Sequence, residues 1–282
     1  MAIPTEAERH RIERFQADLA SGIRTILATL GCRGVGPALS PSDVCLAWAN
    51  YKFRRIAVRP RQVLRSDTLK RASLPSDESA AIDAIEERAS RGVDLYPHQS
   101  TTLLRPLTND GLLADWHIQH LHLGLATGRQ AAAPFVNRSG NILLVRVTDD
   151  AIYFLDCLPH GEDVEPPWWN IDLPETVHRN WPDSIAHLML DDYEPKLSWE
   201  DHRKLRPTRG HGATFTTAVT TSDGTSYLLG GGMVTSGYST TACDSANAVQ
   251  NQVTQIALSR RDDEMLVVTG DHRELHLRVG PR

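Results

Sequence analysis

Residues 141–156 constrain the fold of this chain more than any other segment does. An apolar run over residues 141–147 is typical of a buried strand, and the polar residues 148–150 are typical of a tight turn. Residues 151–156 form a second apolar run, rich in β-branched and aromatic side chains. Two such runs on either side of a short turn predict an antiparallel β-hairpin, so the chain must contain a sheet built around it.

The N-terminal part of the chain has a different period. Apolar residues between Thr5 and Gly31 recur at intervals of three and four, which is the period of a helix that is buried along one side. Thr5 and Glu8 have the spacing of a capping box, and Gly31 is a natural helix terminator. We therefore expect a long amphipathic helix, with a buried side formed by Ile12, Phe15, Leu19, Ile23, Ile26, Leu27 and Leu30.

The patterns predict an α+β protein made of three consecutive regions. Residues 1–95 are expected to be mainly helical, with further helices over 42–51 and 77–91. Residues 96–205 are expected to form a mixed α/β region that contains the hairpin and a group of histidines. Residues 206–282 are expected to be β-rich, because β-branched residues alternate there with turn signals.

The composition is that of an ordinary globular protein. Of the 282 residues, 40% are hydrophobic, and the longest apolar runs are far shorter than the roughly 20 residues that span a bilayer. The first residues lack the basic and then apolar pattern of a secretory signal, so we expect a cytoplasmic protein without a membrane partner. The four cysteines are too widely spaced for a zinc knuckle and too few for a disulfide scaffold. We expect reduced thiols at Cys32, Cys45, Cys157 and Cys243.

Three histidines lie within six residues, at His117, His120 and His122. Histidine has an ordinary pKa of roughly 6.5, so it accepts and donates protons near neutral pH, and its neutral form is the commonest metal ligand. Leu121 and Leu123 alternate with the last two histidines. An extended strand would therefore put His120 and His122 on one face and both leucines in the core. The alternative is that these are ordinary half-buried histidines that bond backbone carbonyls.

Histidines and an arginine can cleave RNA without a metal ion. Attack by the 2′-hydroxyl needs one group that takes a proton, a second that protonates the leaving 5′-oxygen and a cation that stabilises the phosphorane. We expect the end of the hairpin to bring His160 to the same site. The sequence therefore predicts a metal-independent ribonuclease, or another phosphodiester-cleaving enzyme, that uses no cofactor and whose catalytic residues are His117, His120, His122, His160 and Arg146.

The hairpin also resembles part of a known family. Residues 141–161 resemble the central strands of RelE-type and ParE-type toxins, in which a strand with an arginine is followed by a turn and a strand of the pattern Ile-Tyr-x-Leu. The arginine of this chain is Arg146, and the pattern begins at Ile152. The resemblance implies a toxin-like protein that acts on RNA.

Zinc-dependent hydrolysis is an alternative. His120 and His122 resemble the strand-borne ligand pairs of the amidohydrolase family and of the polymerase-and-histidinol-phosphatase family. A catalytic zinc ion needs three protein ligands and one open position. The resemblance implies that His160, Asp156 or His178 would complete the set of zinc ligands.

Residues 52–71 form a basic stretch in a chain whose net charge is −5. Eight basic residues stand against Asp67 alone, a net charge of +7, and such a segment can neutralise several phosphates. RNA-binding contacts are expected from Arg54, Arg55, Arg59, Arg61 and Arg65. One alternative is a solvated surface that acidic residues between 77 and 87 neutralise. Another is a non-enzymatic interaction module, antitoxin-like or phage-related, in which the histidines are packed and the basic stretch binds a protein partner.

Overall fold

The computed structural model describes residues 3–124, 135–161, 170–194, 218–234 and 237–282. The chain divides into two compact units. The first consists of Met1–Arg55, Thr102–Thr108 and Thr241–Arg282, and the second of Ile56–Thr101 and Asn109–Thr240. Helices and strands occur in both units, which confirms the α+β class. Each unit joins segments that are far apart in the sequence, so the boundaries differ from those of the regions 1–95, 96–205 and 206–282.

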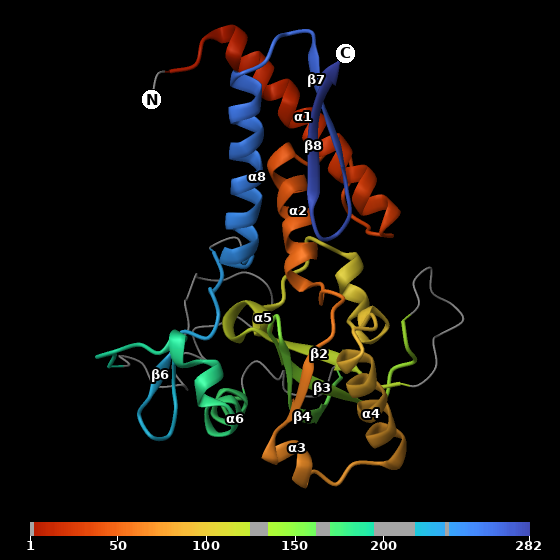
Figure 1. Cartoon of the computed structure of the whole chain (residues 1–282), viewed down its shortest axis with the longest axis vertical. Helices are drawn as coiled ribbons and strands as arrows, with labels where there is room; N and C mark the ends of the chain where they lie inside the picture. The colour runs from red at the N-terminus through yellow and green to blue at the C-terminus, as the bar shows by residue number, and fades with distance from the viewer. Residues whose placement is uncertain (1–2, 125–134, 162–169, 195–217, 235–236) are drawn as a thin grey trace. The chain divides into compact units, whose positions relative to one another are not determined.

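The first unit is built on the long N-terminal helix. It contains α1 (Glu6–Thr29), α2 (Pro41–Arg54), η2 (Thr101–Leu104), α8 (Thr240–Leu258), β7 (Glu264–Gly270) and β8 (Leu275–Pro281), as Figure 1 shows. The Thr5 hydroxyl accepts a hydrogen bond from the Glu8 N–H at 3.3 Å, and Gly31 after the helix has a φ of +78°. The predicted helix and its capping box are therefore confirmed.

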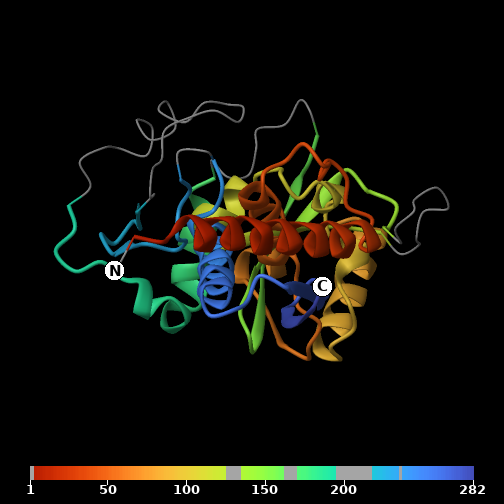
Figure 2. The same ribbon diagram turned by 90° about the horizontal axis from the view of Figure 1, so that it is seen from above.

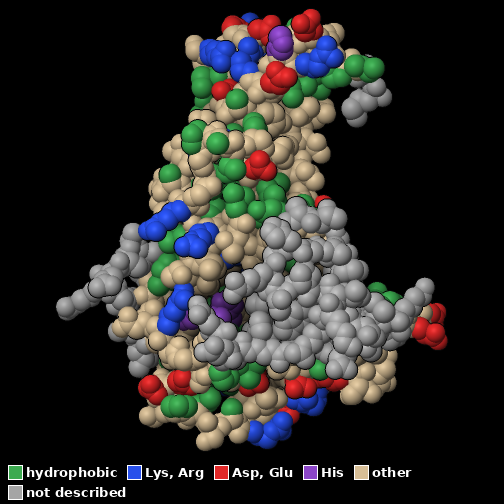
Figure 3. Space-filling model, turned by 180° about the vertical axis from the view of Figure 1, so that it is seen from behind, with side chains coloured by type: hydrophobic (Ala, Val, Ile, Leu, Met, Phe, Trp, Pro, Cys, Tyr) green, Lys and Arg blue, Asp and Glu red, His purple; other side chains and the backbone are tan. Residues whose placement is uncertain are grey.

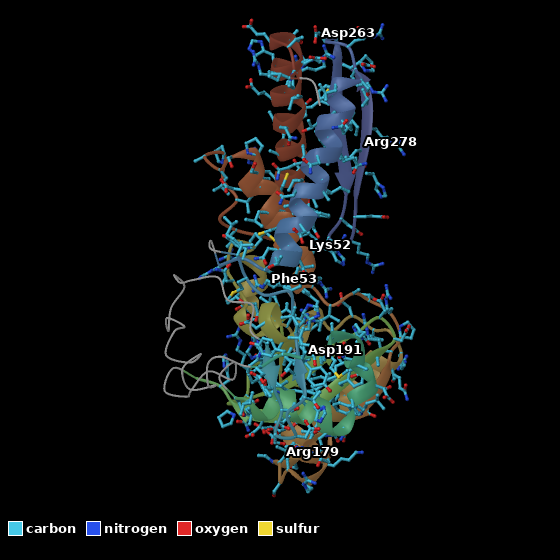
Figure 4. All side chains as sticks on the ribbon, turned by 90° about the vertical axis from the view of Figure 1, so that its left-hand side faces the viewer. Lys52, Phe53, Arg179, Asp191, Asp263 and Arg278 are labelled. Carbon is cyan, nitrogen blue, oxygen red and sulfur yellow. The ribbon has the colours of Figure 1, made fainter. Side chains whose placement is uncertain are left out.

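Helix α1 packs directly against strand β7. A Cβ atom added to Gly22 would lie 2.4 Å from the Cβ atom of Val268, so only glycine permits this close approach. The Asp18 carboxylate accepts a hydrogen bond from the Leu266 N–H at 3.1 Å. Figure 2 shows α1 along its whole length. Arg278 is an exposed residue of β8 (Figure 4).

The C-terminal part is less β-rich than the sequence predicts, because α8 takes up 19 of its residues. The helix buries Ala242, Ala246, Val253 and Ala257, whose spacing puts them on one side. Since three of the four are alanines, the hydrophobic pattern is weak and escaped the sequence analysis. The hairpin of β7 and β8 is present as predicted. Neither α8 nor any other helix among the described residues is long and apolar enough to cross a membrane.

A four-stranded sheet, in the order β1-β4-β3-β2, lies at the centre of the second unit. Its strands are β1 (Gln62–Arg65), β2 (Ile118–His122), β3 (Asn141–Val147) and β4 (Ala151–Pro159). Strands β3 and β4 are antiparallel neighbours, which confirms the predicted hairpin. Strand β2 is antiparallel to β3, and β1 is parallel to β4. The unit also contains α3 (Asp67–Arg71), α4 (Ser76–Ser90), η1 (Tyr96–His98), α5 (Gly111–Trp116), α6 (Asp172–Asn180), η4 (Pro182–Ser184), η5 (Ala186–Leu188), β5 (Val219–Thr220) and β6 (Ser226–Tyr227).

The two shorter helices predicted near the N-terminus are also confirmed. Helix α4 agrees with its predicted range to within one residue at each end. Helix α2 starts one residue earlier than predicted, because Ser40 is its N-cap and Pro41 its first residue. Proline is well suited to that position, since it has no N–H to leave unpaired.

The two faces of the sheet have separate apolar cores. Helix α4 packs on one of them, which we call the α4 face, where Ile82 and Ile85 belong to the same buried cluster as Phe154. Helices α5 and α6 pack on the other, which we call the α6 face, where Trp116 and Val177 are buried with sheet residues. Figure 1 shows α4 and α6 on opposite sides of the strands.

Replacing Phe154 with alanine should destabilise the second unit by about 3–5 kcal/mol, because the lost ring leaves a cavity between α4 and the sheet. Its side chain is 0% exposed. Urea denaturation followed by circular dichroism measures the change. The matched control is Tyr193→Ala, which removes a ring that is 38% exposed and should change the free energy of unfolding by less than about 0.5 kcal/mol. Equal losses in both variants would contradict the assignment of the core.

Candidate active site

Strand β2 puts two of the predicted histidines on one face of the sheet. His120 pairs with Leu144, a residue of the α6 face, and His122 lies two residues further along on that face. Leu121 and Leu123 are buried in the core of the α4 face. The predicted orientation of both histidines and both leucines is therefore confirmed.

A β-bulge brings His160 to the α6 face. The register between β3 and β4 shifts between Leu144 and Val145, which leaves Leu155 as an extra residue in β4. Leu155 and the next residue, Asp156, therefore both lie on the α6 face. Because side chains alternate along a strand, an unbroken register would have put His160 on the α4 face.

The imidazole rings of His120, His122 and His160 form a compact group, which we call the histidine cluster. The ring centroids are 5.4 Å apart for His120 and His122, 5.6 Å for His120 and His160, and 5.8 Å for His122 and His160. The backbone N–H of His160 donates to the Gly140 carbonyl at 2.8 Å, which fixes the end of β4 beside the start of β3. Figure 3 shows histidine side chains on one face of the molecule, next to basic side chains. The predicted position of His160 near the other two is confirmed.

A fourth histidine, His98 in η1, supports the cluster from the side of β2. Its Nδ1 atom is 3.0 Å from the carbonyl oxygen of His122. A carbonyl only accepts hydrogen bonds, so Nδ1 of His98 carries the proton and its Nε2 has a lone pair. Burial lowers the pKa of His98. His98 was not predicted from the sequence, because it lies 24 positions before His122, outside any motif.

Arg138 is the cation beside the histidine cluster. Its side chain is exposed, and its Nη2 donates to the Thr101 hydroxyl at 2.7 Å. It lies close enough to lower the pKa of both His122 and His160. In the described part of the chain, no acidic side chain pairs with it. Arg138 belongs to no sequence motif and lies in an irregular segment three residues before β3.

The environment of His122 keeps its imidazole neutral. The side chain is 2% exposed, and burial, followed by the effects of neighbouring basic groups, lowers its pKa to about 3. Every titratable group that contributes to this shift is basic, namely His120, Arg138, His160 and His98. Within the described residues, Nε2 of His122 has no hydrogen-bond partner. Burial and then Arg138 also lower the pKa of His160. The site thus combines positive potential with a buried proton acceptor.

One carboxyl group shares this face of the sheet. Asp156 lies across β3 from His120, because both residues pair with Leu144. Burial, opposed by a hydrogen bond from the Cys157 N–H and assisted by Asp172, raises the pKa of Asp156. The carboxyl group is therefore easier to protonate than an exposed one.

All four cysteines are free thiols, as expected. Burial raises the pKa of Cys45 and Cys157 to about 12 and that of Cys32 to about 11. A thiol with such a pKa is protonated at neutral pH and is a poor nucleophile.

His117 and Arg146 lie at the beginning of β2. His117 is the C-cap of α5, with a φ of +54°, and precedes β2. Burial, and then the nearby guanidinium of Arg146, lower its pKa. Arg146 pairs with Ile118 and so lies on the α6 face, one row along from His120. Of the five predicted catalytic residues, the structure therefore groups three and puts the other two next to them.

Three arginines of the basic stretch are not exposed. Arg54, Arg55 and Arg61 are buried. The Arg54 guanidinium donates to the carbonyl oxygen of Thr108 at 3.2 Å, and that of Arg61 to the carbonyl oxygen of Thr148 at 2.8 Å. Because these three arginines are buried, the expected continuous basic surface is not present.

The remaining two predicted RNA contacts form ion pairs. Arg59 pairs with Asp149 at 2.9 Å. Arg65 pairs with both Asp83 and Glu86 at 2.6 Å, so residues of α4 neutralise it as the alternative interpretation predicted. The positive charge near the histidine cluster comes instead from Arg138.

Among the described residues, the geometry does not supply a set of ligands for the zinc-dependent alternative. Within the described ranges, no group of three or more His, Cys, Asp or Glu side chains is arranged to hold a metal ion. His178, one of the suggested ligands, shares a hydrogen bond of 2.8 Å with the Tyr227 hydroxyl through Nδ1 and donates from Nε2 to the Asp223 carboxylate at 3.0 Å. Both of its nitrogens are thus engaged away from the histidine cluster.

Comparison with models of protein families, with curated proteins and with solved structures found no match for this chain. The resemblance of residues 141–161 to RelE-type and ParE-type toxins therefore stays a prediction. The functional interpretation rests on the chemistry of the histidine cluster.

Proposed function

We propose that this protein cleaves phosphodiester bonds in RNA by metal-independent acid–base catalysis at the histidine cluster. The observation that carries the proposal is His122, a buried imidazole without a hydrogen-bond partner for Nε2 in the described part of the chain, with Arg138 close enough to lower its pKa. Buried polar atoms are nearly always paired, so an unpaired one at a cationic site indicates a ligand. Neutral Nε2 accepts a hydrogen bond, such as one from a ribose hydroxyl, and the positive charge of Arg138 favours a phosphate beside it.

The reaction divides between a proton acceptor and a proton donor. Neutral His122 accepts the proton of the 2′-hydroxyl as its oxygen attacks phosphorus, and the bond from phosphorus to the 5′-oxygen breaks. An imidazolium of the cluster, His160 or His120, gives its proton to the leaving 5′-oxygen. The products are a 2′,3′-cyclic phosphate and a free 5′-hydroxyl. A phosphate bound among these groups favours their protonated forms, which supplies the acid.

Arg138 supplies the charge that the reaction needs. The phosphorane carries more negative charge than the bound phosphodiester, and a guanidinium within reach stabilises that charge. Arg138 is exposed and lies within electrostatic range of His122 and His160. It therefore also attracts the substrate to the site.

A cleavage assay with a labelled single-stranded RNA tests this function. The wild-type protein is expected to produce ends with a 2′,3′-cyclic phosphate, at the same rate with and without a chelator. Loss of activity in chelator, together with stoichiometric zinc in the purified protein, would favour the zinc-dependent hydrolase instead. Failure to cleave RNA under either condition would favour the non-enzymatic interaction module. A toxin-like role, as the hairpin resemblance implies, predicts growth arrest when the protein is expressed and none with a cleavage-deficient variant.

A further inference from the structure

Arg146 is a buried cation without an anionic partner among the described residues. Its side chain is 4% exposed. Its Nε and Nη1 atoms have no hydrogen-bond partner there, and Nη2 is 3.5 Å from the carbonyl oxygen of Ser184, at the limit of a hydrogen bond. The guanidinium carbon lies 5.7 Å from the ring centroid of Tyr153, so an aromatic ring forms one wall.

The surroundings of Arg146 differ from those of Arg61. Arg61 is equally buried, but its Nε and Nη1 donate to the carbonyl oxygens of Thr148 and Ala57 at 2.8 Å each. Such hydrogen bonds compensate for the burial of an arginine. A buried charge without them costs several kcal/mol of stability. The donors of Arg146 therefore point to an anion that is not part of the described structure.

The position of Arg146 relates this anion to the histidine cluster. Arg146 pairs with Ile118, and His120 is two residues further along β2 on the same face. Such diagonal neighbours are about 7–8 Å apart, which is within the reach of long side chains. An anion on Arg146 is thus a separate group from a phosphate at the histidine cluster, yet close enough to belong to the same molecule.

We propose that Arg146 binds a second phosphate of the substrate, next to the phosphate that is cleaved. Arginine suits this role, because its planar fork donates two parallel hydrogen bonds to phosphate oxygens. The site then selects a strand with successive phosphates over a compound with a single phosphodiester. The assignment of one phosphate to cleavage and of its neighbour to Arg146 rests on the proposed cleavage of RNA. The anion site itself rests on the burial and geometry of Arg146.

A binding experiment with inorganic pyrophosphate tests the anion site without any catalysis. Thermal unfolding is measured in chloride buffer and with increasing pyrophosphate, for the wild type and for Arg146→Met, which removes the charge and keeps an apolar side chain against Tyr153. In chloride, Arg146→Met should melt at the same temperature as the wild type or higher, because an uncompensated charge has gone. The affinity for pyrophosphate, read from the ligand-dependent rise in melting temperature, should fall about tenfold or more.

The control is Arg59→Met, which removes an exposed, ion-paired arginine and should leave pyrophosphate affinity unchanged. If Arg146→Met lowers the melting temperature in chloride and keeps the affinity, Arg146 is a packing residue and the proposal is overturned. If the variant does not fold, Arg146→Lys takes its place, since it retains the charge and loses the fork. Weaker pyrophosphate binding by that variant supports the proposal, and unchanged binding overturns it.

A kinetic experiment tests whether Arg146 binds a phosphate next to the one that is cleaved. The substrates are the dinucleotide UpU, which has one phosphate, and pUpU and UpUp, which each add a neighbouring one. For the wild type, kcat/KM should be about tenfold higher for pUpU or for UpUp than for UpU. In Arg146→Met, this ratio should be close to one. Equal cleavage of all three by the wild type overturns the second-phosphate site. If none is cleaved, the proposed ribonuclease function fails, and pyrophosphate binding still decides whether Arg146 holds an anion.

Discussion

Replacing His122 with asparagine is expected to lower the rate of RNA cleavage by about 10²–10⁴-fold, the usual contribution of a positioned acid–base group. Asparagine retains a polar side chain of similar size but cannot take a proton at neutral pH. His122 is the residue to change, because its Nε2 is the buried acceptor without a partner in the described part of the chain. Single-turnover cleavage of a labelled RNA measures the loss directly.

The matched control is His187→Asn, the same substitution at an exposed histidine of η5. It should leave the rate within about twofold, because surface substitutions away from a site change little. His160→Asn should slow cleavage to a similar degree as His122→Asn. The double variant should be little worse than either, because residues that act as a unit are not additive. Full activity in His122→Asn, with the variant folded, would rule out the proposed mechanism.

Acidification is expected to destabilise the protein through the same histidine. The pKa of His122 is lowered to about 3 in the folded protein, from an ordinary value of 6.5 in the unfolded chain. Between these values the unfolded chain binds a proton that the folded protein excludes, so stability is lost as the pH falls. Each pH unit below about 6.5 costs about 1.4 kcal/mol from this group alone. Burial also lowers the pKa of His98 and His117, which adds to the loss.

Urea denaturation at pH 7.5 and at pH 5.5 measures this effect above the range in which carboxylates titrate. The wild type should lose stability between the two, and His122→Asn should lose less by about 1 kcal/mol or more, because one excluded proton has been removed. His187→Asn should behave as the wild type does. An unchanged pH dependence in His122→Asn would mean that the pKa of His122 is the same in the folded protein as in the unfolded chain, which would contradict a lowered pKa in the folded protein.

Local patterns in the sequence were sufficient for the elements that carry the site. The alternation of His120 and His122 with Leu121 and Leu123 predicted both the strand and its orientation, since a strand separates neighbouring side chains onto two faces. The hairpin of residues 141–156 was predicted for a similar reason, because a turn between two apolar runs leaves antiparallel pairing as the simplest way to bury them.

Whether a charged residue is buried or exposed depends on contacts with residues that are distant in the sequence. Arg61 and Arg138 are chemically identical, yet one donates to backbone carbonyls inside the protein and the other lies exposed beside the histidine cluster. Which carbonyl groups lack a partner follows from how the elements pack. Net charge along residues 52–71 therefore could not tell RNA contacts from structural arginines. Helix α8 was missed for a related reason, because its buried alanines pack well without a strong hydrophobic signal.

The sequence by itself determined strand β2, the hairpin of β3 and β4 and the long capped helix α1, because hydrophobic period and turn chemistry are local properties. Only the tertiary structure decided which residues make up the site. His160 reaches the α6 face because one extra residue, Leu155, changes the phase of β4. His98 supports the histidine cluster through a hydrogen bond to a carbonyl oxygen 24 positions away. Sheet register and long-range packing set these contacts, since each depends on which segments pair and not on the residues next to it.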